Sequence, residues 1–293
     1  MAVLPKGHVV LARESGLVEA FDLNSSSIIW SQKTDSTIDG LISSANGSSV
    51  AGFSRAGQLA TWSADSGTRQ FTATTDGRQL YSAAFINDGS EIVAGGWEDI
   101  SGWTIADGGK LHFVRDKRFL GARHVAPVPN SRQFVTIGIP VAYQLWKSGR
   151  LAGQVTLPIE LKDKRVAGLA ISDKARWLTI AFSDGNIILM DFKSGKLQKV
   201  FNAGRRAVNM KSYLSFSSDE RELLIASGGR VVLLDIASGE IDELYSHLHA
   251  NIAGAQFTPD GKKVVYVISF GAWGPQSIVV WDRTTRTKTE NKL

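Results

Sequence analysis

The sequence predicts an all-β fold, a seven-bladed β-propeller with about four antiparallel strands per blade. Two patterns recur in the same register along its 293 residues. One is a hairpin turn flanked by strand residues, and the other is a large apolar residue at the end of the next strand. A period of about 40–45 residues with several strands per unit is typical of a propeller.

The hairpin turns come first in each repeat. They are centred near Lys6, Asn46, Asp88, Asn130, Asp173, Asp219 and Asp260. The large apolar residues are Phe21, Trp62, Trp103, Trp146, Met190, Leu234 and Trp281, in steps of 41 to 47 residues. We expect these seven residues to occupy equivalent positions and to pack between neighbouring blades, where an aromatic side chain buries a large area.

The repeats fill the chain, so we expect one propeller domain over residues 1–293. The predicted blades cover residues 1–32, 38–74, 80–115, 121–157, 165–202, 209–246 and 251–293. Residues 2–5 should form the inner strand of blade one, and residues 286–292 the outer strand of blade seven. Because the first repeat begins almost at Met1, a second interpretation is that the domain belongs to a longer protein.

The composition is that of a soluble globular protein, with 43% hydrophobic and 21% charged residues. There is no cysteine, which excludes disulfides, thiolate metal sites and cysteine nucleophiles. No stretch approaches the roughly 18 apolar residues of a membrane span, so we expect no membrane insertion. The N-terminus does not have the pattern of a signal peptide. We therefore expect a cytoplasmic protein, or a periplasmic one if a signal segment has been removed.

The common catalytic motifs are missing. The sequence contains no G-x-S-x-G elbow, no phosphate loop and no H-E-x-x-H helix. His247 and His249 form an H-x-H pair that could chelate a metal, but we expect two solvated loop histidines. We therefore expect no catalytic residue, no metal and no cofactor. The rival class is a propeller hydrolase or lyase with a site at the channel mouth, where Glu98 and Asp99 are isolated carboxylates.

The ends of the third strands carry a family resemblance. Trp281-Asp282 is a literal Trp-Asp pair, and Phe21-Asp22, Met190-Asp191 and Leu234-Asp235 keep the aspartate. The chain resembles the WD-repeat family over nearly its whole length. Residues 18–30, VEAFDLNSSSIIW, also resemble a quinoprotein-type repeat. The WD resemblance implies peptide binding on the top face, around the channel mouth. The usual Asp–His–Ser/Thr–Trp network is not expected, because the Gly-His dipeptide is missing from its usual place.

Positive charge gathers on three adjacent connections between an outer strand and the next inner strand. Residues 114–126, 157–168 and 202–213 together carry a formal charge of +7, against +5 for the whole chain. The predicted basic rim consists of Arg115, Lys117, Arg118, Arg123, Lys164, Arg165, Arg205, Arg206 and Lys211. Such a cluster raises the association rate with acidic partners; the alternative is that loops are simply where charged residues lie.

Two tryptophans lie in loops between second and third strands. Trp97 is in GGWEDI (95–100), and Trp273 is in the uncharged SFGAWGPQS (269–277). Tryptophan on a loop is a typical interface anchor. The alternative is that each folds back over its own blade, with Trp273 covering the channel mouth.

These observations predict a non-catalytic scaffold that binds an acidic protein or peptide through the basic rim and a tryptophan anchor. We do not expect nucleic acid as the partner, because Phe119 and Tyr213 are the only aromatic residues in the basic loops. We expect a monomer outside the complex. A sensor or targeting domain of a larger bacterial protein is the other alternative.

Overall fold

Short antiparallel strands make up nearly all of the regular structure. The computed structural model describes residues 1–75, 78–97, 99–114, 119, 121–138, 142–161, 164–204, 211–271 and 276–293. The chain divides into two units. The N-terminal unit comprises Ala2 and residues 8–163, and the C-terminal unit comprises Met1, residues 3–7 and residues 164–293.

The N-terminal unit contains most of blade one and all of blades two to four. Its strands are β2 (His8–Ala12), β3 (Leu17–Asp22), β4 (Ser27–Lys33), β5 (Gly40–Ser43), β6 (Ser49–Phe53), β7 (Gln58–Ser63), β8 (Arg69–Thr74), β9 (Ser82–Ile86), β10 (Glu91–Gly95), β11 (Ile100–Thr104), β12 (His124–Pro127), β13 (Phe134–Ile137), β14 (Ala142–Lys147) and β15 (Arg150–Thr156). Two short 3₁₀ helices, η2 (Asn87–Gly89) and η3 (Ile159–Leu161), lie in its connections.

The C-terminal unit contains blades five to seven. Its strands are β16 (Val166–Ile171), β17 (Trp177–Phe182), β18 (Asn186–Asp191), β19 (Leu197–Asn202), β20 (Tyr213–Phe216), β21 (Glu222–Ser227), β22 (Arg230–Asp235), β23 (Ile241–Ser246), β24 (Asn251–Phe257), β25 (Lys263–Ser269), β26 (Gln276–Asp282) and β27 (Lys288–Lys292). The chain begins with β1 (Ala2–Leu4) and the 3₁₀ helix η1 (Pro5–Gly7).

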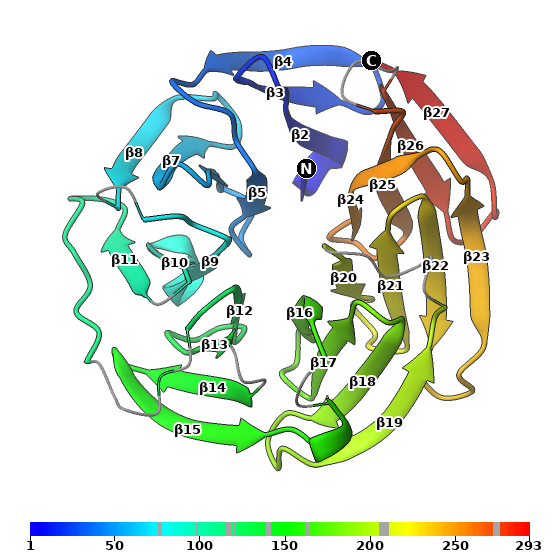
Figure 1. Ribbon diagram of the computed structural model, residues 1–293. Coiled ribbons are helices and arrows are strands. Elements are labelled where there is room, and N and C mark those ends of the chain that lie inside the picture. Colours follow the sequence, from blue (N-terminus) through cyan, green and yellow to red (C-terminus); the bar gives the residue numbers. More distant parts are fainter. Residues whose placement is uncertain are drawn as a thin grey trace. The chain divides into compact units, whose positions relative to one another are not determined.

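Each repeat forms its own sheet, in which strands follow one another in chain order (Figure 1). Among the described residues six sheets have four strands, and the sheet of β9, β10 and β11 has three. The predicted all-β, seven-bladed propeller is therefore confirmed. So are the places of the end strands, because β1 is the first strand of blade one and β27 pairs with β26 of blade seven.

The seven large apolar residues occupy equivalent positions. Each is the second-last residue of the third strand of its blade and is buried. Trp62 pairs with Val50, and Trp281 pairs with Val264. The remaining pairs are Phe21 with Val9, Trp103 with Ile92, Trp146 with Phe134, Met190 with Leu178 and Leu234 with Leu223.

These residues pack between neighbouring blades, as predicted. In the N-terminal unit, Trp103 of blade three belongs to the same apolar cluster as Phe53 and Leu59 of blade two. In the C-terminal unit, Trp281 of blade seven shares a cluster with Leu233 of blade six. The repeated large side chain therefore fills the space between adjacent sheets.

The aspartate after this residue stabilises the turn to the fourth strand. The carboxylate of Asp22 accepts the Asn24 N–H at 2.7 Å, and that of Asp235 accepts the Ser238 N–H at 2.7 Å. Asp191 and Asp282 make the same kind of bond. Hydrogen bonds to the charged carboxylate lower the pKa of each of these four residues. The Asp of each pair therefore has a local role in the turn.

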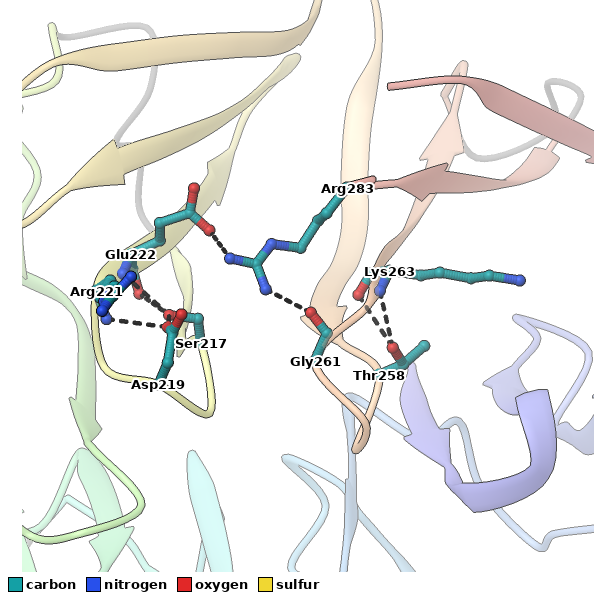
Figure 2. Close-up of polar contacts among 8 residues, drawn as sticks. All are labelled: Ser217, Asp219, Arg221, Glu222, Thr258, Gly261, Lys263 and Arg283. Atoms are coloured by element: carbon teal, nitrogen blue, oxygen red, sulfur yellow. Dashed lines mark hydrogen bonds and ion pairs between the residues drawn. The ribbon is translucent and has the colours of Figure 1, made fainter. Parts of the chain in front are cut away.

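An arginine links the turns of blades six and seven (Figure 2). Arg283, which follows β26, donates to the Glu222 carboxylate at the start of β21 and to the Gly261 carbonyl in the first turn of blade seven. Beside it, the Ser217 hydroxyl bonds to Asp219, 2.6 Å away, and accepts the Glu222 N–H. Side chains of two blades thus hold one another at this end of the sheets.

Candidate aromatic and basic site

The best-defined candidate site lies on three connections of blade three. They are the connection from β8 into β9, the hairpin from β10 to β11, and the connection from β11 into β12. The connections from β8 and from β11 each lead into an inner strand, β9 or β12. Both inner strands begin at the end of the blade where the β10–β11 hairpin turns, so the three connections are neighbours. Trp97 is in the hairpin, Arg123 immediately precedes β12, and Tyr81 immediately precedes β9.

Trp97 and Arg123 form a stacked pair. The Arg123 guanidinium carbon lies 3.7 Å from the centroid of the Trp97 ring and 5.7 Å from that of Tyr81. Trp97 nevertheless remains 53% exposed. A cation above an indole ring is attracted by its negative face, by about 0.5–1 kcal/mol at an exposed site. The indole is therefore held on the surface and does not fold away into the blade.

A glycine allows this close arrangement. Gly121 has a φ of +88°, and a Cβ built on it would lie 2.3 Å from the Trp97 carbonyl oxygen. Any larger residue would push the two loops apart. The Ala122 N–H also donates to the Gly96 carbonyl at 3.3 Å. Backbone contact thus places Arg123 beside Trp97.

Arg78 fixes the connection into β9. Its guanidinium forms an ion pair with Asp99, at the other end of the Trp97 hairpin. The Arg78 side chain is 64% exposed. The carboxylate of Asp99, one of the two carboxylates considered for an enzyme site, is therefore paired with a cation.

In the C-terminal unit the predicted basic residues have different surroundings. The Lys164 ammonium pairs with the Asp184 carboxylate at 2.5 Å, so its charge is locally offset. Arg165 is exposed, and its backbone carbonyl accepts the Ser183 N–H. Lys211 is exposed, with its ammonium 5.3 Å from the ring centroid of Tyr213. These residues present cations on the connections into β16 and β20.

Several predicted residues lie outside the described part of the chain. They are Arg115, Lys117, Arg118, Arg205, Arg206, Trp273 and Glu98. The predictions for these residues remain as the sequence made them.

An apolar group that the sequence analysis did not single out lies on the connection into β24. The His247 ring stands edge-on to Phe270, with centroids 5.2 Å apart. Leu248 is 71% exposed beside them. His247 and His249 were recognised only as a possible metal pair. Within the described residues no group of three or more His, Asp or Glu side chains is placed to hold a metal ion.

Sequence reasoning missed Tyr81 and Arg78 at the Trp97 site. The sequence does carry a signal for both, because they lie in the connection that enters β9, on the same side of the blade as the Trp97 hairpin. The two aromatic residues considered for base stacking are engaged in packing. Phe119 lies edge-on to Trp146, with ring centroids 5.6 Å apart, and Tyr213 packs against a core cluster.

Seven sheets in which the large apolar residue has the same register define a β-propeller repeat protein. Its loops present a stacked Trp–Arg pair. A family model described as outer membrane protein assembly factor BamB matches residues 14–288. Because this match covers most of the chain, the protein belongs to that family.

A second comparison supports the WD-repeat resemblance. The chain is 28% identical over 121 residues to a WD repeat-containing protein of Synechocystis sp. strain PCC 6803. This match covers 41% of the chain and 32% of the relative's length. Within the described residues, no helix is long and apolar enough to cross a membrane.

Proposed function

We propose that this protein is a non-catalytic scaffold that binds a protein or peptide with acidic groups through the connections on one side of its blades. The observation that supports the proposal most directly is the exposed Trp97 stacked with Arg123. An indole supplies a flat apolar contact, and a guanidinium supplies hydrogen-bond donors that match a carboxylate. The two together suit a peptide with an acidic residue beside an apolar one.

The basic rim adds long-range attraction. Arg165 and Lys211 are exposed cations on connections of the C-terminal unit. Exposed charges act mainly on the association rate and are screened by salt. The family description names an assembly factor, and the relative carries WD repeats. Both are consistent with a role in holding other proteins.

The turn aspartates give no support to an acid–base site. Their lowered pKa values arise from hydrogen bonds within their own turns. We therefore propose that binding, and not catalysis, is the activity of this domain. We propose the cytoplasm as its compartment, or the periplasm if a signal segment is removed. Fractionation of cells that make the natural protein, followed by immunoblotting, distinguishes the two.

A peptide array tests this function. Peptides that pair Asp or Glu with Leu or Phe should bind the wild-type protein more strongly than Lys-substituted copies. Trp97→Ala and Arg123→Gln should each weaken that binding. Lys196→Glu, a change at an exposed turn lysine of blade five, is the control and should have little effect. Equal binding of acidic and basic peptides, or unchanged binding by both site variants, would contradict the proposal.

A further inference from the structure

Among the described residues, part of the outermost strand of blade three, β11, has no strand paired to its outer side. In the other six sheets a regular fourth strand follows the third. After β11 the described chain makes one isolated bridge, between Trp103 and Lys110. The sheet consists of β9, β10 and β11 among the described residues. The described residues therefore cover only half of the outer side of β11.

The segment that would complete the blade turns toward blade four. The Val114 N–H donates to the Gly149 carbonyl at 2.9 Å. The Phe113 ring lies edge-on to Phe134 and Trp146, with centroids 5.8 and 6.2 Å apart. Packing of Phe113 on blade four therefore draws the chain away from the first half of β11.

The pattern of hydrogen bonds shows which groups face the open edge. The Thr104 N–H donates to the Gly109 carbonyl, and the Gly102 carbonyl accepts the Leu111 N–H. Alternate residues of a strand point their backbone groups the same way. The Gly102 N–H and both backbone groups of Ile100 therefore face outward. No backbone partner for these groups is found among the described residues.

A groove of about 210 Å³ lies along this edge. Ile100 and Gly102 line it together with Thr75, Arg78, Lys110 and Phe113. The side chains of Leu111 and Phe113 pack over Gly102, where a Cβ would come within 3.0 Å of both, and they form the apolar wall of the groove. The lining thus combines backbone groups of β11, an apolar wall, the cation Lys110 and the ion-paired Arg78.

We propose that the edge of β11 binds an extended acidic peptide, which adds to blade three as its missing outer strand. Peptides join exposed sheet edges through backbone hydrogen bonds, and the side-chain surroundings select the sequence. The occupant is acidic because the cation Lys110 lines the groove and none of the described lining residues is acidic; Arg78 also lines the groove but is paired with Asp99. Lys110 is exposed and has no ion pair among the described salt bridges. Arg78 borders both surfaces, because it pairs with Asp99 of the Trp97 hairpin, but the edge of β11 is not part of the stacked Trp97–Arg123 pair. The proposal goes beyond the function proposed above.

The probe is a labelled peptide, TVEVEVT, with two matched forms. One form replaces both glutamates by lysine, and the other carries N-methyl groups on alternate amides. Fluorescence anisotropy with the wild-type protein should show binding of TVEVEVT. The N-methylated form should bind about tenfold more weakly, because it cannot donate to the edge. This comparison leaves the protein unchanged, so it is independent of any folding defect.

Three protein variants locate the site. Lys110→Glu should weaken binding about threefold, which is the size expected for one exposed charge pair. Ile100→Pro removes an N–H that faces the edge and should weaken binding further. Lys196→Glu changes a turn lysine in a blade whose fourth strand is present, and it should leave binding unchanged. Circular dichroism confirms that each variant is folded.

Amide exchange gives a direct readout. The Ile100 and Gly102 amides should exchange more slowly when TVEVEVT is bound. Failure of TVEVEVT to bind, equal binding of the N-methylated form, or equal effects of Lys110→Glu and Lys196→Glu would each overturn the proposal. Dimerisation that Ile100→Pro abolishes would assign the edge to a second copy and would also overturn it. If Trp97→Ala alone abolishes binding, the edge is not the site, although the proposed scaffold function survives.

Discussion

The guanidinium of Arg123 lies 3.7 Å from the centre of the Trp97 ring, on a loop that precedes a different strand. This contact joins two of the residues that the sequence suggested separately, one as part of a basic rim and one as an aromatic anchor. It also explains why an indole can remain 53% exposed at a defined position.

Trp97→Ala should separate binding from stability. Because the side chain is half exposed, its removal should change the free energy of unfolding by less than about 1 kcal/mol. If Trp97 is an anchor, binding of an acidic peptide should weaken by about 2 kcal/mol. Thermal unfolding and calorimetric titration measure the two effects. The matched control is Trp281→Ala, at a buried site between blades, which should cost about 3–5 kcal/mol of stability. A large loss of stability with Trp97→Ala would show that the indole is part of the core.

Arg123→Lys should test the stacked geometry. Lysine keeps the charge but lacks the planar group that covers an indole and binds a carboxylate with two hydrogen bonds. We expect Arg123→Lys to bind acidic peptides almost as weakly as Arg123→Gln in calorimetric titrations. Full affinity with Arg123→Lys would show that only the charge matters.

Arg165 and Lys164 should differ in their effect on association. Lys164 is paired with Asp184, whereas Arg165 is exposed. Arg165→Glu should therefore slow the association of an acidic peptide more than Lys164→Glu does, and the difference should shrink as salt is added. Stopped-flow fluorescence at two salt concentrations measures this. Equal rates for the two variants would show that the basic rim does not contribute to the association rate.

The link between Arg283 and Glu222 should contribute to stability. Each side chain is about one quarter exposed, and Arg283 also holds the Gly261 carbonyl. Arg283→Ala should lower the free energy of unfolding by about 1–3 kcal/mol, because it leaves hydrogen-bonding groups of two turns without a partner. A double-mutant cycle with Glu222→Gln measures the coupling. Strict additivity of the two changes would show that the pair does not act as a unit.

The turn aspartates should make stability depend on pH. Hydrogen bonds lower the pKa of Asp22, Asp191, Asp235 and Asp282 in the folded protein below the unfolded value. Their contribution is therefore present above the unfolded pKa and is lost as the pH falls through the folded pKa. Replacing all four by Asn should flatten the fall in melting temperature between about pH 5 and pH 2. An unchanged acid profile would contradict this role.

Asp173 should behave in the opposite way. Removal of water from its carboxylate and the nearby Glu220 carboxylate raise the pKa of Asp173, although the residue as a whole is exposed. A raised pKa favours the folded state at low pH, and this contribution is lost as the pH rises through the folded pKa. Asp173→Asn should therefore raise the melting temperature at neutral pH, with a gain that disappears in acid. A gain of the same size at every pH would point to another cause.

Much of the fold could be predicted from the sequence because each repeat encodes its own sheet. Trp62 and Trp281 fall in the same register as their relatives, and the hairpin turns contain the glycine, asparagine or serine that such turns need. Both signals are local. The shortened sheet of blade three could not be predicted, because its cause is a contact of Phe113 with Phe134 and Trp146 in the next blade.

The candidate site was predictable only in part. The exposure of Trp97 follows from its loop, but its contact with Arg123 depends on how two loops meet at Gly121. The pairing of Lys164 with Asp184 joins a loop to a hairpin twenty residues away, and a formal charge sum cannot show it. The contacts between loops therefore could not be predicted from the sequence.

The most direct test of the central claim is quantitative affinity capture with the wild-type protein and with Trp97→Ala/Arg123→Gln. Both are used as baits in a lysate of the organism that encodes the chain, and the captured proteins are measured by mass spectrometry. We expect at least one stoichiometric partner with an acidic segment, which the double variant retains at less than about one tenth of the wild-type level. The same stoichiometric partners on both baits, or none on the wild-type bait, would contradict it.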